Sequence, residues 1–568
     1  MPQLHNLPET QKNLTNMPAS LTPKEQPSVF APPPWPWTKE RWNKKIEGVH
    51  EAIRETIDYV THTINARNNA IDEKKGLKAE GVAKVANNRM KLTLELTELL
   101  TELASLGPKP RSPLDRKKKW SENRISEIEK LLGNDLDILQ ESMRQNELSK
   151  TIFELDNQTA RLNDCEKVLE SLKDNVLSLF EKILSNEIKN ELQKYSPDYV
   201  FRLFLEQVSI DINLIHQALQ QRQLNKDDEI TQQGFVLQMA HIIGMNAVLP
   251  AINDKGGFTE DTNIICYLRN GVDIRLIPYQ NVMLIGVPYG VLCHNSQWVP
   301  TDYLALPHEI GHYLFWFRQE PTKEILKENL EEKLRTQFGE DFESSWQFHW
   351  LEEIVADAFG CRIAGPISVL GFQELLASSP PTAREALDHV HPTPELRPFI
   401  QSELLHKMGQ INAEQKEKLD QNWISWVKEN WLKEKTANPM DEHPFQLHGQ
   451  NPNSKLTGKE ILESLDPVLE IVADQIMALI PENEHRNWSH DWGNNEPMSV
   501  ETLYNNFTSG GFLERFKPLE AVKPDAPRPV HRFDPSQTKL DKLDDKWVED
   551  MLFKGWSKEG PEGSNLGT

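Results

Sequence analysis

The sequence has few cysteines, no excess of basic residues and no long uninterrupted hydrophobic run. Its 568 residues include four cysteines, Cys165, Cys266, Cys293 and Cys361, and none stands in a CxxC pair. This spacing excludes a disulfide scaffold and a thiolate zinc cluster. Acidic residues outnumber basic ones by 86 to 63, for a net charge of −23. Nucleic acids and anionic membrane surfaces select basic patches, so neither is expected as a partner.

Membrane-spanning and secretory segments are also missing from the sequence pattern. The longest uncharged stretch, Leu276 to Thr301, is interrupted by prolines, glycines and a histidine. A membrane helix needs about 20 mostly apolar residues, so this stretch predicts short strands and turns, with no membrane span. Residues 1–40 lack the basic and apolar regions of a secretory signal. We therefore expect a soluble, cytoplasmic protein, although export without an N-terminal signal stays open.

The length of the chain exceeds one compact core and predicts several domains. Composition divides it into five regions. They are a disordered leader with nine prolines (1–38), a helical bundle or coiled-coil arm (39–195), a mixed helical and strand domain (196–409), a Trp-rich helical lobe (410–520) and a flexible tail (521–568).

The predicted arm carries a hydrophobic seam with a spacing that alternates between three and four residues. Such a 3.5-residue period is typical of coiled coils and helical bundles. The region is broken once, between Gly107 and Pro113, so an antiparallel hairpin within one chain is expected. An arm that binds a partner or self-associates is the alternative. The seam comprises Leu148, Ile152, Leu155, Thr159, Leu162, Cys165, Leu169, Leu172, Val176, Leu179 and Ile183.

Three short apolar runs follow the arm and are separated by turn residues. Their β-branched content predicts the strands of a small sheet. Helical patterns surround them, so the fold class expected is α+β and predominantly helical. The runs are Asn263–Leu268, Val272–Ile277 and Val282–Val287.

Residues 308–312 carry the pattern HExxH, which points to metal chemistry. On a helix, His308 and His312 share a face, so both imidazoles can reach one ion. Glu309 can take a proton from a metal-activated water and act as the general base. Pro307 directly precedes the motif, so the helix is expected to begin just upstream or to bend there.

A third ligand is expected on a later helix, because catalytic zinc takes three protein ligands and keeps one position open. Glu353 and Asp357 lie four residues apart on one helical face, with Glu353 as the zinc ligand and Asp357 orienting a ligating histidine. Glu352 is rotated away by about 100° and is disfavoured as a ligand. A second EIVAD pentapeptide, Glu470–Asp474, predicts a core helix and is the alternative ligand helix.

HExxH followed by ExxAD resembles the gluzincin metallopeptidases. The segment His391–Arg397 is similar to the HP…R element of the CAAX prenyl endopeptidase superfamily. The resemblance implies a zincin-like domain within 196–409, with Zn²⁺ on the two motif histidines and Glu353 and with Glu309 as base. It also implies that His391 or Arg397 stabilises the oxyanion or shapes the site. His389 competes for this role, and a plain Arg–carboxylate contact is the alternative for Arg397.

The function expected is a soluble zinc-dependent endopeptidase acting on a protein or peptide substrate. Its helical arm would position substrate, bind a protein partner or restrict access. The strand Val282–Val287 is expected to be the sheet edge that pairs with an extended peptide, and Tyr303 and Tyr313 are candidate oxyanion donors. Alternatives are a helical interaction protein whose catalysis is not its main role, a protease effector or toxin acting on one protein, and an amidase or other metallohydrolase.

Overall fold

The computed structural model has an α+β fold that is predominantly helical, as the sequence predicts. The predicted leader up to residue 36, the predicted tail and His389 lie outside the described residues. The structure describes residues 37–105, 112–132, 136–171, 197–226, 229–252, 258, 262–277, 282–295, 298–316, 326–377, 391–431, 440, 444–445, 447, 455–481, 486–490 and 499–509.

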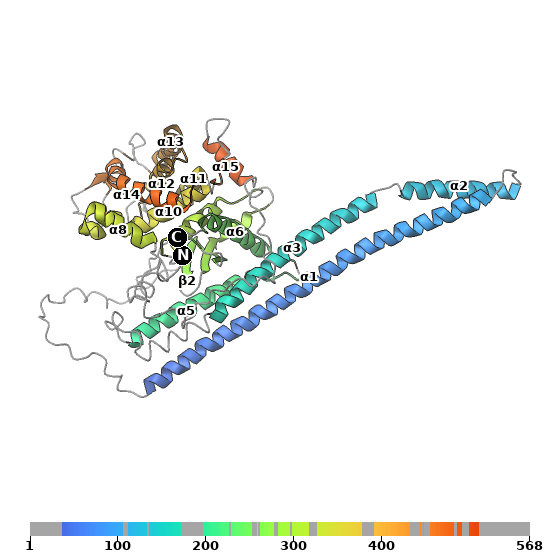
Figure 1. Cartoon of the computed structure of the whole chain (residues 1–568), viewed down its shortest axis with the longest axis horizontal. Helices are drawn as coiled ribbons and strands as arrows, with labels where there is room; N and C mark the ends of the chain where they lie inside the picture. The colour runs from blue at the N-terminus through green and yellow to red at the C-terminus, as the bar shows by residue number, and fades with distance from the viewer. Residues whose placement is uncertain are drawn as a thin grey trace, which may run out of the picture.

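A long helical hairpin extends away from the rest of the molecule (Figure 1). Helix α1 (Trp37–Ser105) has 69 residues, and the chain returns along it through α2 (Ser112–Leu132) and α3 (Leu136–Ser171). Leu155 of the predicted seam packs with Ala70 and Ile71 of α1. The predicted hairpin within one chain is therefore confirmed. The seam beyond Ser171 lies outside the described residues.

The sheet has the three predicted strands, β1 (Asn263–Arg269), β2 (Asp273–Ile277) and β3 (Val282–Pro288), in the order β1-β3-β2. Strand β3 pairs parallel with β1 and antiparallel with β2. The prediction that Val282–Val287 forms the sheet edge is therefore wrong. Both backbone edges of β3 are already used by neighbouring strands, so no row of donors and acceptors remains for a peptide.

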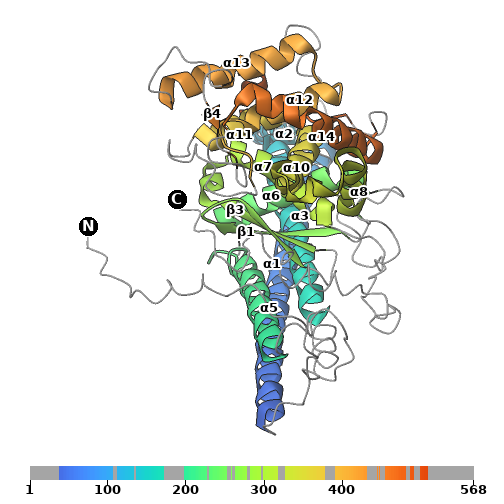
Figure 2. The ribbon, with the colours of Figure 1, turned by 90° about the vertical axis from the view of Figure 1, so that its left-hand side faces the viewer.

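The sheet lies between two groups of helices (Figure 2). Helices α6 (Gln232–Val248) and α7 (Ala305–Trp316) contact one side, while α5 (Pro197–Gln220) and α3 contact β1 from the other. Among the described residues, the segment Gln232–Ala251 is the one helix long and apolar enough to cross a membrane. Its side chains pack against β1 and α7, which is the position of a core helix.

One hydrophobic cluster runs from Val236 on α6 to Phe507 near the end of the described chain. A smaller cluster holds Trp423 and Trp431 against Phe399. The remaining elements are α8 (Leu326–Phe338), α9 (Trp346–His349), α10 (Leu351–Ala364), α11 (Pro366–Ala377), α12 (Arg397–Lys407), α13 (Ala413–Asn430), α14 (Gly458–Leu479), α15 (Val500–Thr508), β4 (Pro444–Phe445), β5 (Leu456–Thr457) and the 3₁₀ turns Leu249–Ala251, Tyr289–Cys293, Thr301–Leu304 and Glu340–Ser344.

Helices α7 and α10 cross at very short range because glycines lie at the contact. A Cβ atom built on Gly311 would lie 2.6 Å from Cα of Ala356. A Cβ atom on Gly360 would lie 3.4 Å from the backbone nitrogen of His308. The two backbones therefore approach closely at both positions. This contact constrains both the distance between the axes of α7 and α10 and the position of α7 along α10.

We expect Gly311→Ala to lower the urea midpoint of unfolding, because the added methyl group meets backbone atoms that cannot rotate away. Overpacking of this kind costs about 1–3 kcal/mol. The control is Gly76→Ala on α1, where nothing lies within 4 Å of the added atom; there the gain in helix propensity should stabilise by up to about 1 kcal/mol. Equal midpoints for the two variants would contradict the close crossing.

Candidate metal centre

Helix α7 supplies the two histidines of the HExxH motif. The helix begins at Ala305, which confirms the prediction of a start just upstream of Pro307. In the first turn the missing N–H of proline interrupts no helical hydrogen bond. His308 is 3% exposed and His312 is 1% exposed. Both imidazoles therefore lie in the interior, on the face of α7 that meets α10.

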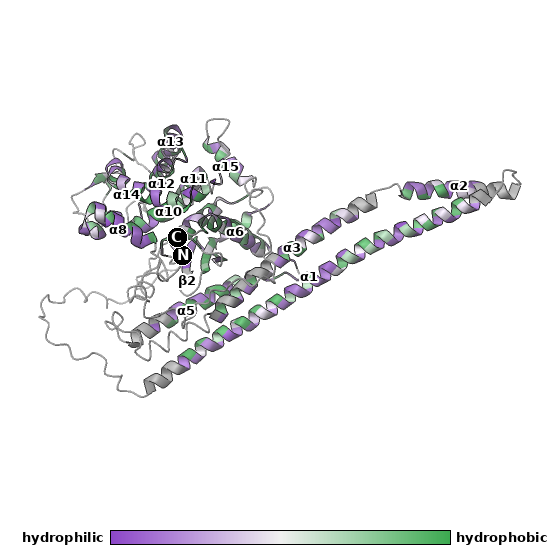
Figure 3. Cartoon of the chain, viewed as in Figure 1, coloured by the Kyte–Doolittle hydropathy of each residue, from purple (hydrophilic) through white to green (hydrophobic). Residues whose placement is uncertain are grey.

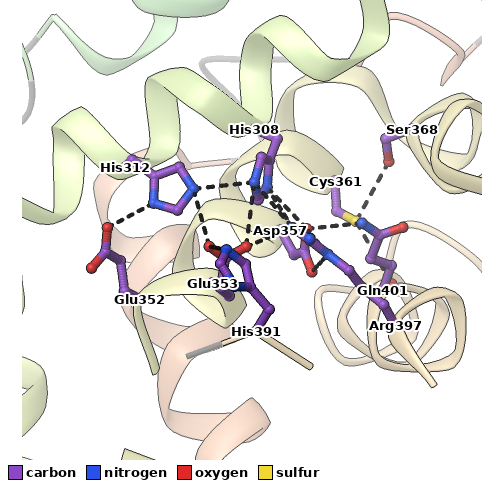
Figure 4. A network of polar contacts seen from close by, with 10 residues as sticks. All are labelled: His308, His312, Glu352, Glu353, Asp357, Cys361, Ser368, His391, Arg397 and Gln401. Atoms are coloured by element: carbon purple, nitrogen blue, oxygen red, sulfur yellow. Dashed lines mark hydrogen bonds and ion pairs between the residues drawn. The ribbon is translucent and has the colours of Figure 1, made fainter. Parts of the chain in front are cut away.

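Helix α10 places Glu353 opposite the two histidines (Figure 4). His308 Nε2 lies 3.2 Å from His312 Nε2. Glu353 Oε2 lies 3.6 Å from His308 Nε2, and its Oε1 lies 3.5 Å from His312 Nε2. Atoms bonded to one tetrahedral ion at about 2.0–2.1 Å lie about 3.3 Å apart. This buried cluster could therefore hold a metal ion.

Asp357, one turn after Glu353, contacts the far nitrogen of His308. Its Oδ1 lies 3.0 Å from His308 Nδ1, and Gln401 Nε2 donates to the same oxygen at 2.9 Å. A carboxylate at Nδ1 orients the ring and leaves the Nε2 lone pair directed at the ligand cluster. The structure thus places Asp357 where the sequence predicts an orienting residue.

His312 has a corresponding partner in Glu352. Glu352 Oε1 lies 2.9 Å from His312 Nδ1, and its side chain is 22% exposed. Sequence reasoning set Glu352 aside as a ligand and gave it no other role. The position of Glu352 on α10 was the available signal. Its rotation of about 100° from Glu353 directs its side chain toward the later turn of α7, where His312 lies. Gln401 was missed because it lies on a distant helix with no motif of its own.

The electrostatics of the site keep His308 in the form that binds metals. Burial lowers the pKa of His308 to about 4, and the charge of Arg397 acts in the same direction. Burial opposes ionisation of Asp357, but Arg397 and His308 hold the pKa of Asp357 below its ordinary value. At neutral pH the site therefore presents a neutral imidazole beside an ionised carboxylate, as metal coordination requires.

Arg397, at the start of α12, joins the two buried carboxylates. It donates from Nε to Asp357 Oδ2 and from Nη2 to Asp357 Oδ1, each at 2.9 Å. Nη2 also lies 2.8 Å from Glu353 Oε2 and 3.0 Å from His308 Nε2. The planar side chain packs over the ring of Phe372, 4.8 Å from its centroid. This geometry is the Arg–carboxylate contact that the sequence left as an alternative.

His391 and Glu309 are the remaining residues that the sequence predicts for the site. His391 Nε2 lies 3.2 Å from Glu353 Oε1, and the His391 side chain is 30% exposed. Glu309 is 7% exposed, and its Oε2 atom has no hydrogen-bond partner among the described residues. A buried carboxylate oxygen in this state is a fitting acceptor for a water molecule held at the site.

The two candidate oxyanion donors and the alternative ligand helix lie away from the cluster. Tyr303 donates to the Val236 carbonyl at 3.2 Å in the core, and Tyr313 packs against Phe258. In the second EIVAD pentapeptide, Glu470 and Asp474 are exposed on α14. This confirms the prediction of a core helix there, with its carboxylates directed to solvent.

We expect purified protein to bind about one divalent ion per chain, and Glu353→Gln to reduce this content strongly. An amide oxygen is a much weaker ligand than a carboxylate. Glu470→Gln is the matched control, because it makes the same change in the same pentapeptide sequence on an exposed face. Elemental analysis of both variants checks this, and unchanged metal in Glu353→Gln would refute the ligand set.

Asp357→Asn should weaken metal affinity about 10- to 100-fold, the usual effect of losing a carboxylate that orients a ligating histidine. The matched control is Asp474→Asn in the second pentapeptide. Competition titrations with a chelating dye measure both affinities. Equal affinities would show that Asp357 serves packing alone.

Comparison with known proteins supplies no family for this chain. No family model matches it, and no curated protein or solved structure gives a significant match. The functional argument therefore rests on the residues and geometry of the site itself.

Proposed function

We propose that this protein is a zinc-dependent endopeptidase whose catalytic centre is of the zincin type, similar to the gluzincins. The observation that supports it best is the buried triangle of two imidazole nitrogens and one carboxylate with side lengths of 3.2 to 3.6 Å. A set of two histidines and one glutamate with an open fourth position suits catalytic zinc. The ligands would be His308, His312 and Glu353.

In this proposal Glu309 is the general base. Zinc, when bound, supplies Lewis-acid activation of a water molecule and of the scissile carbonyl. The Glu309 carboxylate accepts the proton of the attacking water and returns it to the leaving amine. Its buried Oε2 has no hydrogen-bond partner among the described residues. This supports the role, because no described donor occupies the lone pairs that would accept the proton of the water. A metal site with a purely structural role would not need a buried carboxylate at this position.

His391 and Arg397 take different roles in the proposal. Arg397 is committed to Asp357 and Glu353 by short contacts and is 8% exposed, so it shapes the site and balances its charge. His391 is the most exposed residue of the cluster's surroundings in Figure 4. We propose that His391 faces the substrate and stabilises the developing oxyanion.

An extended peptide would pair with β2 in place of the central strand β3. β2 is a terminal strand of the sheet and contacts α7, the helix that bears the motif. The other terminal strand is partly blocked, because Gln221 bonds both the backbone N–H and the carbonyl of Leu268 on β1. In this proposal, backbone pairing with β2 would hold a protein substrate beside the helix that carries the motif.

A second candidate function is a helical interaction protein with a structural metal site. The burial of the ligands supports it, since Glu353 is 0% exposed and His312 is 1% exposed. Structural zinc sites are closed to solvent, whereas catalytic sites keep one open position. The base Glu309 distinguishes the two, because a structural site does not require it.

Glu309→Gln should keep its metal and lose proteolytic activity by at least about 100-fold, since proton transfer contributes at least that factor. The experiment compares new protein N-termini in cells producing wild-type protein with those producing Glu309→Gln. Peptides cleaved by wild type alone support the endopeptidase.

The control is Glu332→Gln on α8, an exposed glutamate whose replacement should leave the cleavage profile unchanged. Identical profiles for wild type and Glu309→Gln, with metal retained in both, would favour the structural metal site.

A further inference from the structure

Gln401 is a buried polar residue of α12 to which the proposed mechanism gives no role. It is 1% exposed, and its Nε2 donates to Asp357 Oδ1 at 2.9 Å (Figure 4). Its Oε1 is also buried and has no hydrogen-bond partner among the described residues. Burying an amide costs free energy unless its polar atoms are hydrogen-bonded. Because only one side of this amide is satisfied, Gln401 contributes little to stability, and its bond to Asp357 needs another explanation.

Helix α12 presents two donors to the same carboxylate. Arg397 and Gln401 lie four residues apart, so they share a helical face, and α12 packs against α10, which carries Asp357. Arg397 donates from Nε to Asp357 Oδ2 and from Nη2 to Oδ1. The same Oδ1 also lies 3.0 Å from His308 Nδ1. Asp357 Oδ1 is therefore the atom at which α7, α10 and α12 meet.

The two donors differ in what they bring to Asp357. Arg397 contributes a positive charge that the two buried carboxylates need. Gln401 is neutral, so its bond leaves the charge of the site unchanged. An additional bond to Oδ1 restricts rotation of the carboxylate about the Cβ–Cγ bond of Asp357. It thereby keeps Oδ1 at the ring nitrogen of His308, and the contact at that nitrogen sets the direction of the opposite lone pair.

We propose that Gln401 is a positioning residue of the metal centre, which holds Asp357 so that His308 directs Nε2 at the ion. This role rests on the proposed zinc centre. Among the described residues, no hydrogen bond joins the Gln401 side chain to His308, His312 or Glu353. Gln401 therefore acts on the ligands through the carboxylate of Asp357.

Gln401→Met keeps the length of the side chain and removes its donor. Competition with a chelating dye should show a zinc dissociation constant raised about tenfold, the lower end of the effect of residues that orient a ligand from outside. The urea midpoint of the metal-free variant should stay close to that of wild type, because methionine buries no unsatisfied amide. Unchanged zinc affinity would overturn the proposal.

Gln373→Met is the matched control, because it makes the same change at another buried glutamine. Gln373 on α11 is 5% exposed, and its Nε2 donates to the Leu419 carbonyl at 3.1 Å. Its zinc affinity should equal that of wild type. An equal loss of zinc affinity in Gln373→Met and Gln401→Met would reject the positioning role, since general loosening of the core would then explain both.

A double-mutant cycle with Asp357→Ala tests whether Gln401 acts through Asp357. Without the carboxylate the Gln401 donor has nothing to hold, so adding Gln401→Met should not change zinc affinity further. An equal loss with and without Asp357 would reject the proposal.

A spectroscopic measurement gives the same decision without the Asp357→Ala variant. Co²⁺ binds the same kinds of ligand as zinc, and its visible absorption bands depend on coordination geometry. Co²⁺-loaded Gln401→Met should therefore differ in these bands from wild type, whereas Gln373→Met should match it. Identical spectra for all three proteins would overturn the positioning role.

The outcomes separate this role from the proposed function. Wild-type protein that binds no zinc would refute both. Zinc binding that is weakened in Gln401→Met, together with identical cleavage profiles for wild type and Glu309→Gln, would support the positioning role and refute the endopeptidase alone.

Discussion

The close crossing of α7 and α10 is the constraint on which the metal centre depends. Two imidazoles on one helix and a carboxylate on another can bind the same ion only if the helix axes lie at the right distance from each other. Gly311 sets that separation, because a Cβ atom there would lie 2.6 Å from the Ala356 backbone. The glycine lies inside the HExxH pattern at a variable position, so the motif carries both the ligands and the contact that brings the third ligand to them.

Burial of three charged side chains around one histidine is tolerable because the guanidinium of Arg397 offsets part of the charge of the two carboxylates. Glu353 and Asp357 are almost completely buried, and Arg397 contacts both. Breaking such a buried pair leaves an uncompensated charge, at a cost of about 3–5 kcal/mol. A planar guanidinium can bond two carboxylates at once, which a lysine ammonium does less well. Burial and Arg397 keep His308 neutral by lowering its pKa, while the contact from Asp357 orients the ring.

The sheet is small, and it joins the helical hairpin to the site. Gln221 of the segment after α5 bonds the edge of β1, and buried Asp211 of α5 pairs with Arg275 of β2. Helix α5, which packs against α1 and α3 of the hairpin, is therefore anchored to both terminal strands, while α7 lies on the other face. One seam of the arm closes within the chain, and a different face of α1, along which hydrophobic residues recur (Figure 3), remains exposed.

The sequence by itself determined the elements and their chemistry: the helical arm and its seam, the three strands, the start of α7 and the HExxH and ExxAD residues. These follow from periodicity and spacing within one segment, which local physics controls. Tertiary structure alone decided the strand order, which made β3 central, and the roles of Glu352 and Gln401. It also directed Arg397 toward the carboxylates. The side-chain contacts of Glu352, Gln401 and Arg397 join residues 40 or more positions apart, and no local pattern encodes which surfaces of two helices will meet.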